Sequence, residues 1–306
     1  MERLRKEAPC DVWMSLDRIW RCDVFRAGDG VHRAWLERRK KSATPWQKLS
    51  HLLNGKHRDL LRLEDALLGK GGASRVIANS RMVAEEITQI YGYPSSKIDI
   101  IANGVPVTAF RPNARQRSTE RAALGLNDDD VALLFVGSGW ERKGLRFAID
   151  AIEANGDSRM RLLVAGRGNQ RKYKSRCAHF LGVVRDLPTL YAAADIFILP
   201  TLYDPFSNAS LEALAAGLPV ITTRGNGFSE VIEDGVHGTV VEDSRDVSAL
   251  VDAIHTWSIL ESRVGARSRI VERAAQFDIS INVARTLEIL FQAANAASTS
   301  GKSRNT

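Results

Sequence analysis

The sequence predicts an α/β fold with two domains, each built on a parallel β-sheet. Three observations point to it. Residues 196–199 and 218–222 are short apolar runs typical of buried strands, and residues 209–217 between them have the composition of a helix. A second passage from strand to helix begins with the apolar run 131–136. The length of 306 residues accommodates two domains of ordinary size.

The remaining elements continue this alternation. Ser80 is placed to cap a helix over 82–91, and Asn103-Gly104 is a turn signal. We expect strands, some with their turns, at 11–16, 75–80, 98–105, 131–136, 161–168, 196–199 and 218–222. We expect helices at 82–91, 209–217, 244–257, 258–275 and 279–296.

Two carboxylates lie beside the strand at 196–199. Asp204 falls in the loop after it, and Glu212 falls in the first turns of the next helix, which Ser207 or Asn208 is placed to cap. Ligands of open parallel sheets bind beyond the carboxyl ends of the strands, and a helix start offers N–H groups to anionic oxygens. We therefore expect both carboxylates to face one ligand-binding cleft.

The turn after residues 131–136 carries glycines and paired cations. Gly137 and Gly139 are followed by Arg142 and Lys143, just before a helix. The glycines leave room for a ligand, the helix start offers N–H groups, and the cations neutralise negative charge on a leaving group. This combination predicts a diphosphate site. Ordinary surface cations are the alternative interpretation.

Residues 194–223, ADIFILPTLYDPFSNASLEALAAGLPVITT, resemble the donor-sugar motif of retaining family-4 glycosyltransferases, which have the GT-B fold. That motif runs Glu, seven residues, Glu, then a helix of short residues and Gly-x-Pro-Val. Glu212 matches the second Glu, and Asp204 stands where the family usually has the first. The shorter Asp departs from the motif and puts its reach to the sugar hydroxyls in question. The resemblance implies an α/β chain of two Rossmann-like domains (GT-B), the first incomplete.

The resemblance implies transfer of a hexose from a nucleotide diphosphate sugar, with retention of the anomeric configuration. UDP-glucose is the favoured donor, and the lipopolysaccharide core or a related glycan is the acceptor. Arg142 and Lys143 would grip the diphosphate in place of a metal, and neither a protein nucleophile nor a cofactor is expected. Glu212 would hold the ribose hydroxyls and Asp204 those of the sugar. Backbone N–H groups would assist Asp204 from Phe206, Ser207 and Asn208.

Three further candidates come from the same resemblance. Val184 and Arg185 lie in a segment that borders the nucleotide base in family members. His32 follows Gly28 and Gly30 in a glycine-punctuated loop, where the family places a polar group near donor and acceptor. A surface or packing residue is the alternative interpretation of His32.

The domain organisation follows from these assignments. We expect a partial N-terminal acceptor domain over 1–120 and a donor domain over 121–278. A linker rich in Pro, Arg, Asn and Asp would extend across their boundary, from Pro106 to about Asp130. A helix at 279–296 would cross back to the first domain, and residues 297–306 would form a disordered tail. An open α/β domain normally begins with a strand, a glycine-rich turn and a helix, and we see none before residue 10. We therefore expect that an N-terminal segment is missing.

Residues 35–62 form a basic tract with tryptophans and leucines interleaved. A helix of this composition suits the surface of an anionic bilayer, whereas a solvated face with core leucines is the alternative interpretation. The basic residues are Arg38, Arg39, Lys40, Lys41, Lys48, Lys56 and Arg58, and the apolar ones are Trp35, Trp46, Leu49, Leu52 and Leu53.

The net charge, the aromatic residues and the cysteines indicate which classes of partner and which compartment suit the protein. A formal charge of +7 and a pI near 9.5 favour anionic partners such as nucleotide sugars or anionic lipids. We expect no nucleic acid, because the aromatic residues form no stacking platform. The scattered cysteines Cys10, Cys22 and Cys177 are typical of free thiols in a reducing compartment. We expect a cytoplasmic protein that contacts the inner face of the plasma membrane.

Two alternatives to the lipopolysaccharide acceptor stay open. The same fold could act in exopolysaccharide or glycolipid assembly, because the first domain chooses the acceptor. If the N-terminal segment is absent, the chain could instead be a non-catalytic module that binds nucleotide sugars or an anionic surface.

Overall fold

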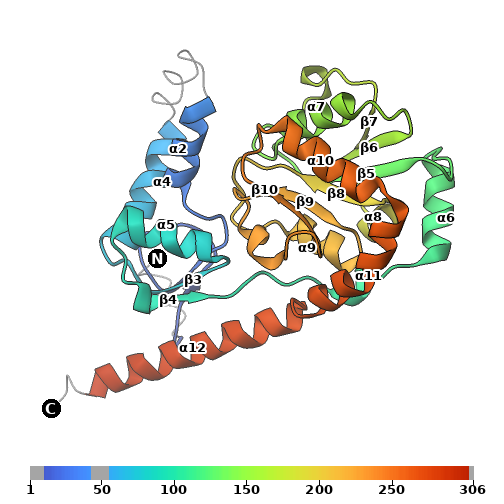
Figure 1. The fold of residues 1–306 in the computed structure, drawn as a ribbon. Helices are drawn as coiled ribbons and strands as arrows, with labels where there is room; N and C mark the ends of the chain where they lie inside the picture. The colour runs from blue at the N-terminus through green and yellow to red at the C-terminus, as the bar shows by residue number, and fades with distance from the viewer. Residues whose placement is uncertain (1–9, 43–54, 303–306) are drawn as a thin grey trace. The chain divides into compact units, whose positions relative to one another are not determined.

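The computed structural model describes residues 10–42 and 55–302, which fold as two compact units (Figure 1). The first unit comprises Met1–Ala102 and Ile281–Thr306, and the second comprises Asn103–Ser280. The division therefore precedes the boundary that we expected near residue 120. The segment in between contains helix α6 (Ala114–Ala123), which packs on α8 (Leu187–Ala193) inside the second unit.

The first unit contains a parallel sheet in the order β1-β2-β3-β4. Its strands are β1 (Met14–Ser15), β2 (Cys22–Ala27), β3 (Ala73–Ala78) and β4 (Ile98–Ile100). Its helices are α2 (His32–Ser42), α4 (Gly55–Glu64), the π-helical turn Asp65–Gly69, α5 (Arg81–Tyr91), the 3-10 turn Ser95–Lys97 and most of α12 (Ile279–Lys302).

Alternate strand residues of the first sheet face opposite layers, as the two-residue period of a strand requires. On one face Phe25 and Val76 pack in the cluster that includes Val83 of α5. On the other face Val24 packs with Ile289 of α12. Figure 1 shows α5 and α12 on opposite sides of β3 and β4. As expected, the Ser80 hydroxyl caps α5 by accepting from the Val83 N–H.

Helix α12 extends further than we expected. It continues to Lys302, so residues 297–302 are helical rather than part of a disordered tail, and residues 303–306 lie outside the described chain. Residues 293–298, AANAAS, are rich in alanine, the residue with the highest helix propensity, and contain no proline to stop the helix.

The second unit contains a six-stranded parallel sheet in the order β10-β9-β8-β5-β6-β7. Its strands are β5 (Val131–Val136), β6 (Met160–Ala165), β7 (Ala178–Gly182), β8 (Ile196–Leu199), β9 (Val220–Thr223) and β10 (Gly238–Val241). Besides α6 and α8, its α-helices are α7 (Leu145–Asn155), α9 (Asn208–Ala215), α10 (Val247–Ser258) and α11 (Leu260–Ala275). Its 3-10 turns are Val107–Phe110, Gln170–Lys172 and Gly227–Val231.

The strand order of this parallel sheet reverses between β5 and β8. From β5 the chain proceeds outward to β6 and β7, and then returns to β8 and proceeds outward to β9 and β10. Such a reversal leaves a crevice at the carboxyl ends of the two central strands, where open α/β sheets bind ligands. Every residue of β5 and β8 is buried. The predicted strands at 131–136 and 196–199 are confirmed, and β9 lies slightly later than the predicted 218–222.

The expected linker over 106–130 is partly helical. Asn113 caps α6 because its side-chain oxygen accepts from the N–H groups of Arg115 and Gln116. The composition rich in Pro, Asn and Asp that indicated a linker thus includes a helix cap.

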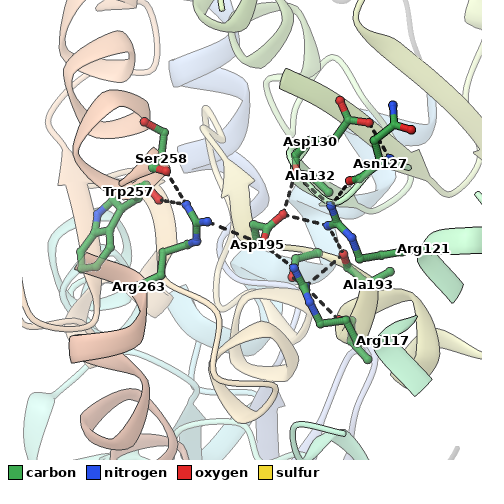
Figure 2. A network of polar contacts seen from close by, with 12 residues as sticks. Arg117, Arg121, Asn127, Asp130, Ala132, Ala193, Asp195, Trp257, Ser258 and Arg263 are labelled. Carbon is green, nitrogen blue, oxygen red and sulfur yellow. Dashed lines mark hydrogen bonds and ion pairs between the residues drawn. The ribbon is translucent and has the colours of Figure 1, made fainter. Parts of the chain in front are cut away.

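Asp195, immediately before β8, connects helices α6 and α11 to the amino end of the sheet (Figure 2). Its carboxylate accepts from Arg117 at 2.7 Å, from Arg121 at 3.1 Å and from the backbone N–H of Ala132 at 2.8 Å. Arg263 of α11 lies 3.8 Å away. Both α6 arginines also donate to carbonyls at the end of α8, which have no partner within that helix.

The basic tract at 35–62 is described only in part. Residues 43–54, with Trp46, Lys48, Leu49, Leu52 and Leu53, lie outside the described chain, as does the Lys41 side chain. In the described part Arg38 pairs with Glu86 at 2.8 Å, while Lys56, Arg58 and Arg62 are exposed. Within 10–42 and 55–302, none of the helices has the length and apolar character needed to cross a bilayer.

Candidate functional site

The glycine-rich turn after β5 lies directly against the end of β8. Gly144 has a φ of +78°, and a Cβ at this position would lie 1.9 Å from the carbonyl oxygen of Pro200. A Cβ on Gly137 would lie 2.6 Å from Cδ of Lys143. Glycine is therefore required at 144, where a positive φ coincides with the close approach of two loops. At 137 the absence of a side chain leaves room for Lys143.

The paired cations of this turn are held by the loop after β8. The Arg142 carbonyl accepts from the Leu202 N–H and the Thr201 hydroxyl, both at 2.9 Å. The Arg142 guanidinium donates to the Tyr203 carbonyl at 2.6 Å. These bonds join the two loops that follow β5 and β8, and they place the Arg142 side chain at the crevice of the sheet.

Asp204 lies against both cations. Its Oδ2 is 3.0 Å from Nζ of Lys143 and 3.6 Å from a guanidinium nitrogen of Arg142. The residue is only 6% exposed, yet within the described chain Oδ2 has no aligned hydrogen bond. The carboxylate thus interacts with the cations mainly through charge.

The backbone around Asp204 is fixed from a neighbouring loop. Its N–H donates to the Gly225 carbonyl at 2.9 Å, and its carbonyl accepts from Gly227 at 2.8 Å. The buried Asn226 side chain accepts from the N–H groups of Ser207 and Phe228. These bonds hold the segment from Asp204 to the start of α9 in one conformation.

Glu212 on α9 has a buried partner. Its Oε2 accepts from the hydroxyl of Tyr191 at 2.9 Å. Burial raises the pKa of Glu212 above its ordinary value, and the Tyr191 hydrogen bond and the positive charge of Lys143 partly offset that rise. Within the described residues, Lys143 is thus the one cation whose charge affects the pKa of Glu212.

The structure brings Arg142, Lys143 and Asp204 together, and Glu212 lies on the following helix, α9. Ser207 caps α9, and Asn208 accepts from the Asn103 side chain at 2.8 Å. The remaining predicted residues have less specific surroundings: Gly139 borders open space, Val184 is half-buried, Arg185 is exposed and Phe206 packs edge-on against Phe228.

His32 lies in the first unit and is the first residue of α2, not a residue of the preceding loop. Its Nε2 is 3.0 Å from Nδ1 of His57. Its backbone N–H donates to Glu64, a carboxylate that is 1% exposed and also accepts from Arg18 and Tyr91. Burial lowers the pKa of His32 to about 4, so the ring is neutral at pH 7.

Sequence reasoning missed three of these supporting residues. Tyr191 contacts Glu212, which is 21 residues away in the sequence, and Asn226 contacts Asp204, which is 22 residues away. Glu64 contacts His32 across 32 residues. No local pattern marks such contacts. The one available signal was polar residues in apolar surroundings, such as Tyr191 in LPTLYAAAD.

Two family models match parts of the chain. Residues 130–258 match the family described as "Glycosyl transferases group 1", and residues 29–109 match the family described as "Glycosyltransferase Family 4". The first match contains Arg142, Lys143, Asp204 and Glu212.

Curated relatives carry related names. A glycosyltransferase of Methanocaldococcus jannaschii is 32% identical over 178 residues, which cover 54% of this chain and 46% of the relative. The D-inositol 3-phosphate glycosyltransferase of Thermobifida fusca is 31% identical over 230 residues, covering 67% of this chain and 52% of the relative. The chain therefore spans about half the length of these relatives.

Solved structures show the same fold. WaaG, a glycosyltransferase involved in lipopolysaccharide biosynthesis, superposes with a TM-score of 0.80 at 22% identity, covering 94% of this chain and 80% of WaaG. Anabaena HepE in complex with UDP-glucose superposes with a TM-score of 0.69 at 20% identity, covering 88% of this chain and 72% of HepE. The architecture is the α/β GT-B fold, with two parallel sheets.

Proposed function

We propose that this GT-B chain, whose two units match glycosyltransferase families, transfers a hexose from a nucleoside diphosphate sugar with retention of configuration. The observation that carries the proposal is the cation pair Arg142 and Lys143 at the crevice between β5 and β8. We favour glucose from UDP-glucose, since HepE binds that donor in the same fold. We favour the lipopolysaccharide core or a related glycan as acceptor, since WaaG is involved in lipopolysaccharide biosynthesis.

The two cations supply the chemistry that the reaction needs most. A nucleoside diphosphate leaves with negative charge, so the barrier falls when nearby positive groups stabilise that charge. Arg142 donates to the Tyr203 carbonyl and Lys143 pairs with Asp204, so both side chains have partners that can position them for the donor. We therefore expect transfer to continue in the presence of a metal chelator.

Glu212 suits the ribose hydroxyls of the donor. The Tyr191 hydroxyl donates to Oε2 and orients the carboxylate, whose oxygens accept hydrogen bonds from ribose. Val184 and Arg185, on the loop before α8, are the candidates beside the nucleotide base.

For the sugar hydroxyls we propose hydrogen-bond partners other than the expected Asp204. Asp204 is occupied by both cations, and the Ser207 N–H already donates to Asn226. We therefore assign the sugar hydroxyls to the backbone N–H groups of Phe206 and Asn208. His32, in the first unit and with a neutral ring at pH 7, remains a candidate for contacting the substrate.

The experiment is a calorimetric titration of the chain with UDP and UDP-glucose. Arg142→Ala and Glu212→Ala should each weaken binding of both ligands by at least about tenfold, the effect of losing a hydrogen bond to a charged group. Arg245→Ala and Glu242→Ala are matched controls, because both side chains are exposed within the same unit, and they should bind as the parent does.

The outcomes separate the candidate functions. Binding together with transfer of radiolabelled glucose to a lipopolysaccharide core acceptor supports the proposal. Transfer only to another glycan or glycolipid supports the exopolysaccharide or glycolipid alternative. Binding without transfer to any acceptor supports a nucleotide-sugar binding module, and absence of binding to every nucleotide sugar contradicts the site.

We also propose that the basic tract contacts an anionic membrane. The exposed Lys56, Arg58 and Arg62 on α4 support it, because each basic group near an anionic surface contributes about 1 kcal/mol. The chain should cosediment with vesicles that contain phosphatidylglycerol and not with purely zwitterionic ones. Replacing these three residues by Gln should reduce cosedimentation, and unchanged cosedimentation would exclude α4 from the contact.

A further inference from the structure

We propose that Asp204 is an internal counter-ion for Arg142 and Lys143, which competes with the diphosphate and so sets how tightly the site holds it. The inference rests on the proposed function and deepens it. It assigns Asp204 a positioning role that acts through the two cations, in place of a contact with the sugar hydroxyls.

The Asp204 carboxylate lies beside the cations. Oδ2 lies within 3.6 Å of both cations, while the Asp204 backbone is fixed on both sides by the 225–227 loop. An aspartate is one methylene shorter than the glutamate usual at this position of the motif. The residue is only 6% exposed, and its Oδ2 lies against both cations.

The ion pair between Asp204 and the cations lacks an aligned hydrogen bond at Oδ2, within the described residues. That oxygen is buried. Charge-assisted hydrogen bonds are about twice as strong as neutral ones, and a contact without alignment loses much of that strength. A phosphate oxygen that offers aligned bonds can therefore displace the carboxylate.

The carboxylate also lowers the net positive charge of the site. Without Asp204, two cations would lie beside a partly buried crevice with Glu212 as the remaining acid of the predicted site. Such a site would bind any diphosphate tightly, including the product. A built-in carboxylate that repels phosphate weakens this binding, which favours the exchange of nucleoside diphosphate for new donor.

The test is Asp204→Asn, which keeps the shape of the side chain and removes its charge. Binding of UDP and of inorganic pyrophosphate is measured by calorimetry at fixed salt. We expect both ligands to bind about tenfold more tightly than to the parent, or about 1.4 kcal/mol. Asp204→Glu retains the charge and should stay within about threefold of the parent.

A double-mutant cycle shows whether Asp204 acts through the cations. In a Lys143→Met background, Asp204→Asn should tighten binding much less than in the parent, because one of its two partners is gone. A merely structural role would produce the same change in both backgrounds, which would overturn the inference.

Each remaining outcome is decisive. If Asp204→Asn weakens UDP-glucose binding and leaves UDP unchanged, Asp204 contacts the sugar and the inference is wrong while the proposed function stands. Tighter pyrophosphate binding without binding of any nucleotide sugar supports the inference and contradicts the function. Unfolding of both Asp204→Asn and Asp204→Ser, followed by circular dichroism, would assign Asp204 to stability and overturn the inference.

Discussion

At each end of the second sheet one aspartate lies among arginine or lysine side chains. The two carboxylates differ in the hydrogen bonds that they accept. At the amino end, Asp195 accepts three hydrogen bonds from Arg117, Arg121 and the Ala132 N–H. At the carboxyl end, Asp204 meets Arg142 and Lys143, but its Oδ2 has no aligned hydrogen bond within the described chain. Similar residue types thus form a structural support at one end and an incomplete cluster at the other.

The difference follows from what surrounds each cluster. The arginines around Asp195 also donate to backbone carbonyls, so every charge has several partners and the buried network is stable. At the carboxyl end, the cations lie in a crevice that we assign to an anionic ligand. Their best partner there would be a diphosphate, and the resident carboxylate is a weaker substitute.

The largest expected effect comes from neutralising Asp195. Asp195→Asn leaves the buried Arg121 without its anionic partner, and breaking a buried pair in this way costs about 3 to 5 kcal/mol. Asp204→Asn should change stability by only about 1 kcal/mol, because its ion pair has no aligned hydrogen bond. Hydrogen exchange of peptides from β5, measured by mass spectrometry, reports the stability of this unit.

The control is Asp243→Asn, whose partner Arg245 is exposed, so the change should be negligible. Equal losses from Asp195→Asn and Asp204→Asn would contradict the contrast between the two ends of the sheet.

Two glycines at the carboxyl end of the sheet, Gly144 and Gly139, separate the effect of a close contact from that of backbone strain. Gly144→Ala would place its Cβ 1.9 Å from the Pro200 carbonyl at a positive φ, so we expect a loss of about 3 kcal/mol and weaker binding of UDP. Gly139 has a similar φ of +73° but borders open space, so Gly139→Ala should cost about 1 kcal/mol. Thermal unfolding by circular dichroism measures both, and equal effects would show that backbone strain alone matters.

The sequence predicted the parts of this molecule that depend on local patterns. Apolar runs indicated β5 and β8, and the Ser80 and Ser207 caps indicated two helix starts. These features succeed because period, capping chemistry and spacing act over a few residues.

The rest depends on contacts between distant segments. Whether Asp204 faces the cations or a sugar is decided by the bonds from the 225–227 loop, about 20 residues away. The Asp195 network likewise joins Arg117 to a residue 78 positions later. The sequence contains these side chains but no local signal of their pairing.

The smallest expected effect concerns Glu212, where removing a charge should increase stability. Its raised pKa means that between the ordinary value and the raised one the folded chain holds a proton that the unfolded chain has lost. Stability conferred by this group is therefore present below the ordinary pKa and is lost as the pH rises through the raised pKa. The free energy of unfolding of Glu212→Gln should not fall in this way, because glutamine does not ionise. It should exceed that of the parent by about 1 kcal/mol at neutral pH, a common gain at functional sites.

Thermal unfolding of the parent and of Glu212→Gln as a function of pH tests this sign. The melting temperature of the variant should exceed that of the parent at pH 7, and the gap should close below about pH 4, where the carboxyl is protonated in both states. Glu242→Gln, on an exposed side chain, should show no such gap. A variant less stable than the parent at pH 7 would mean that the Glu212 charge supports the fold as Asp195 does, and the two ends of the sheet would no longer differ.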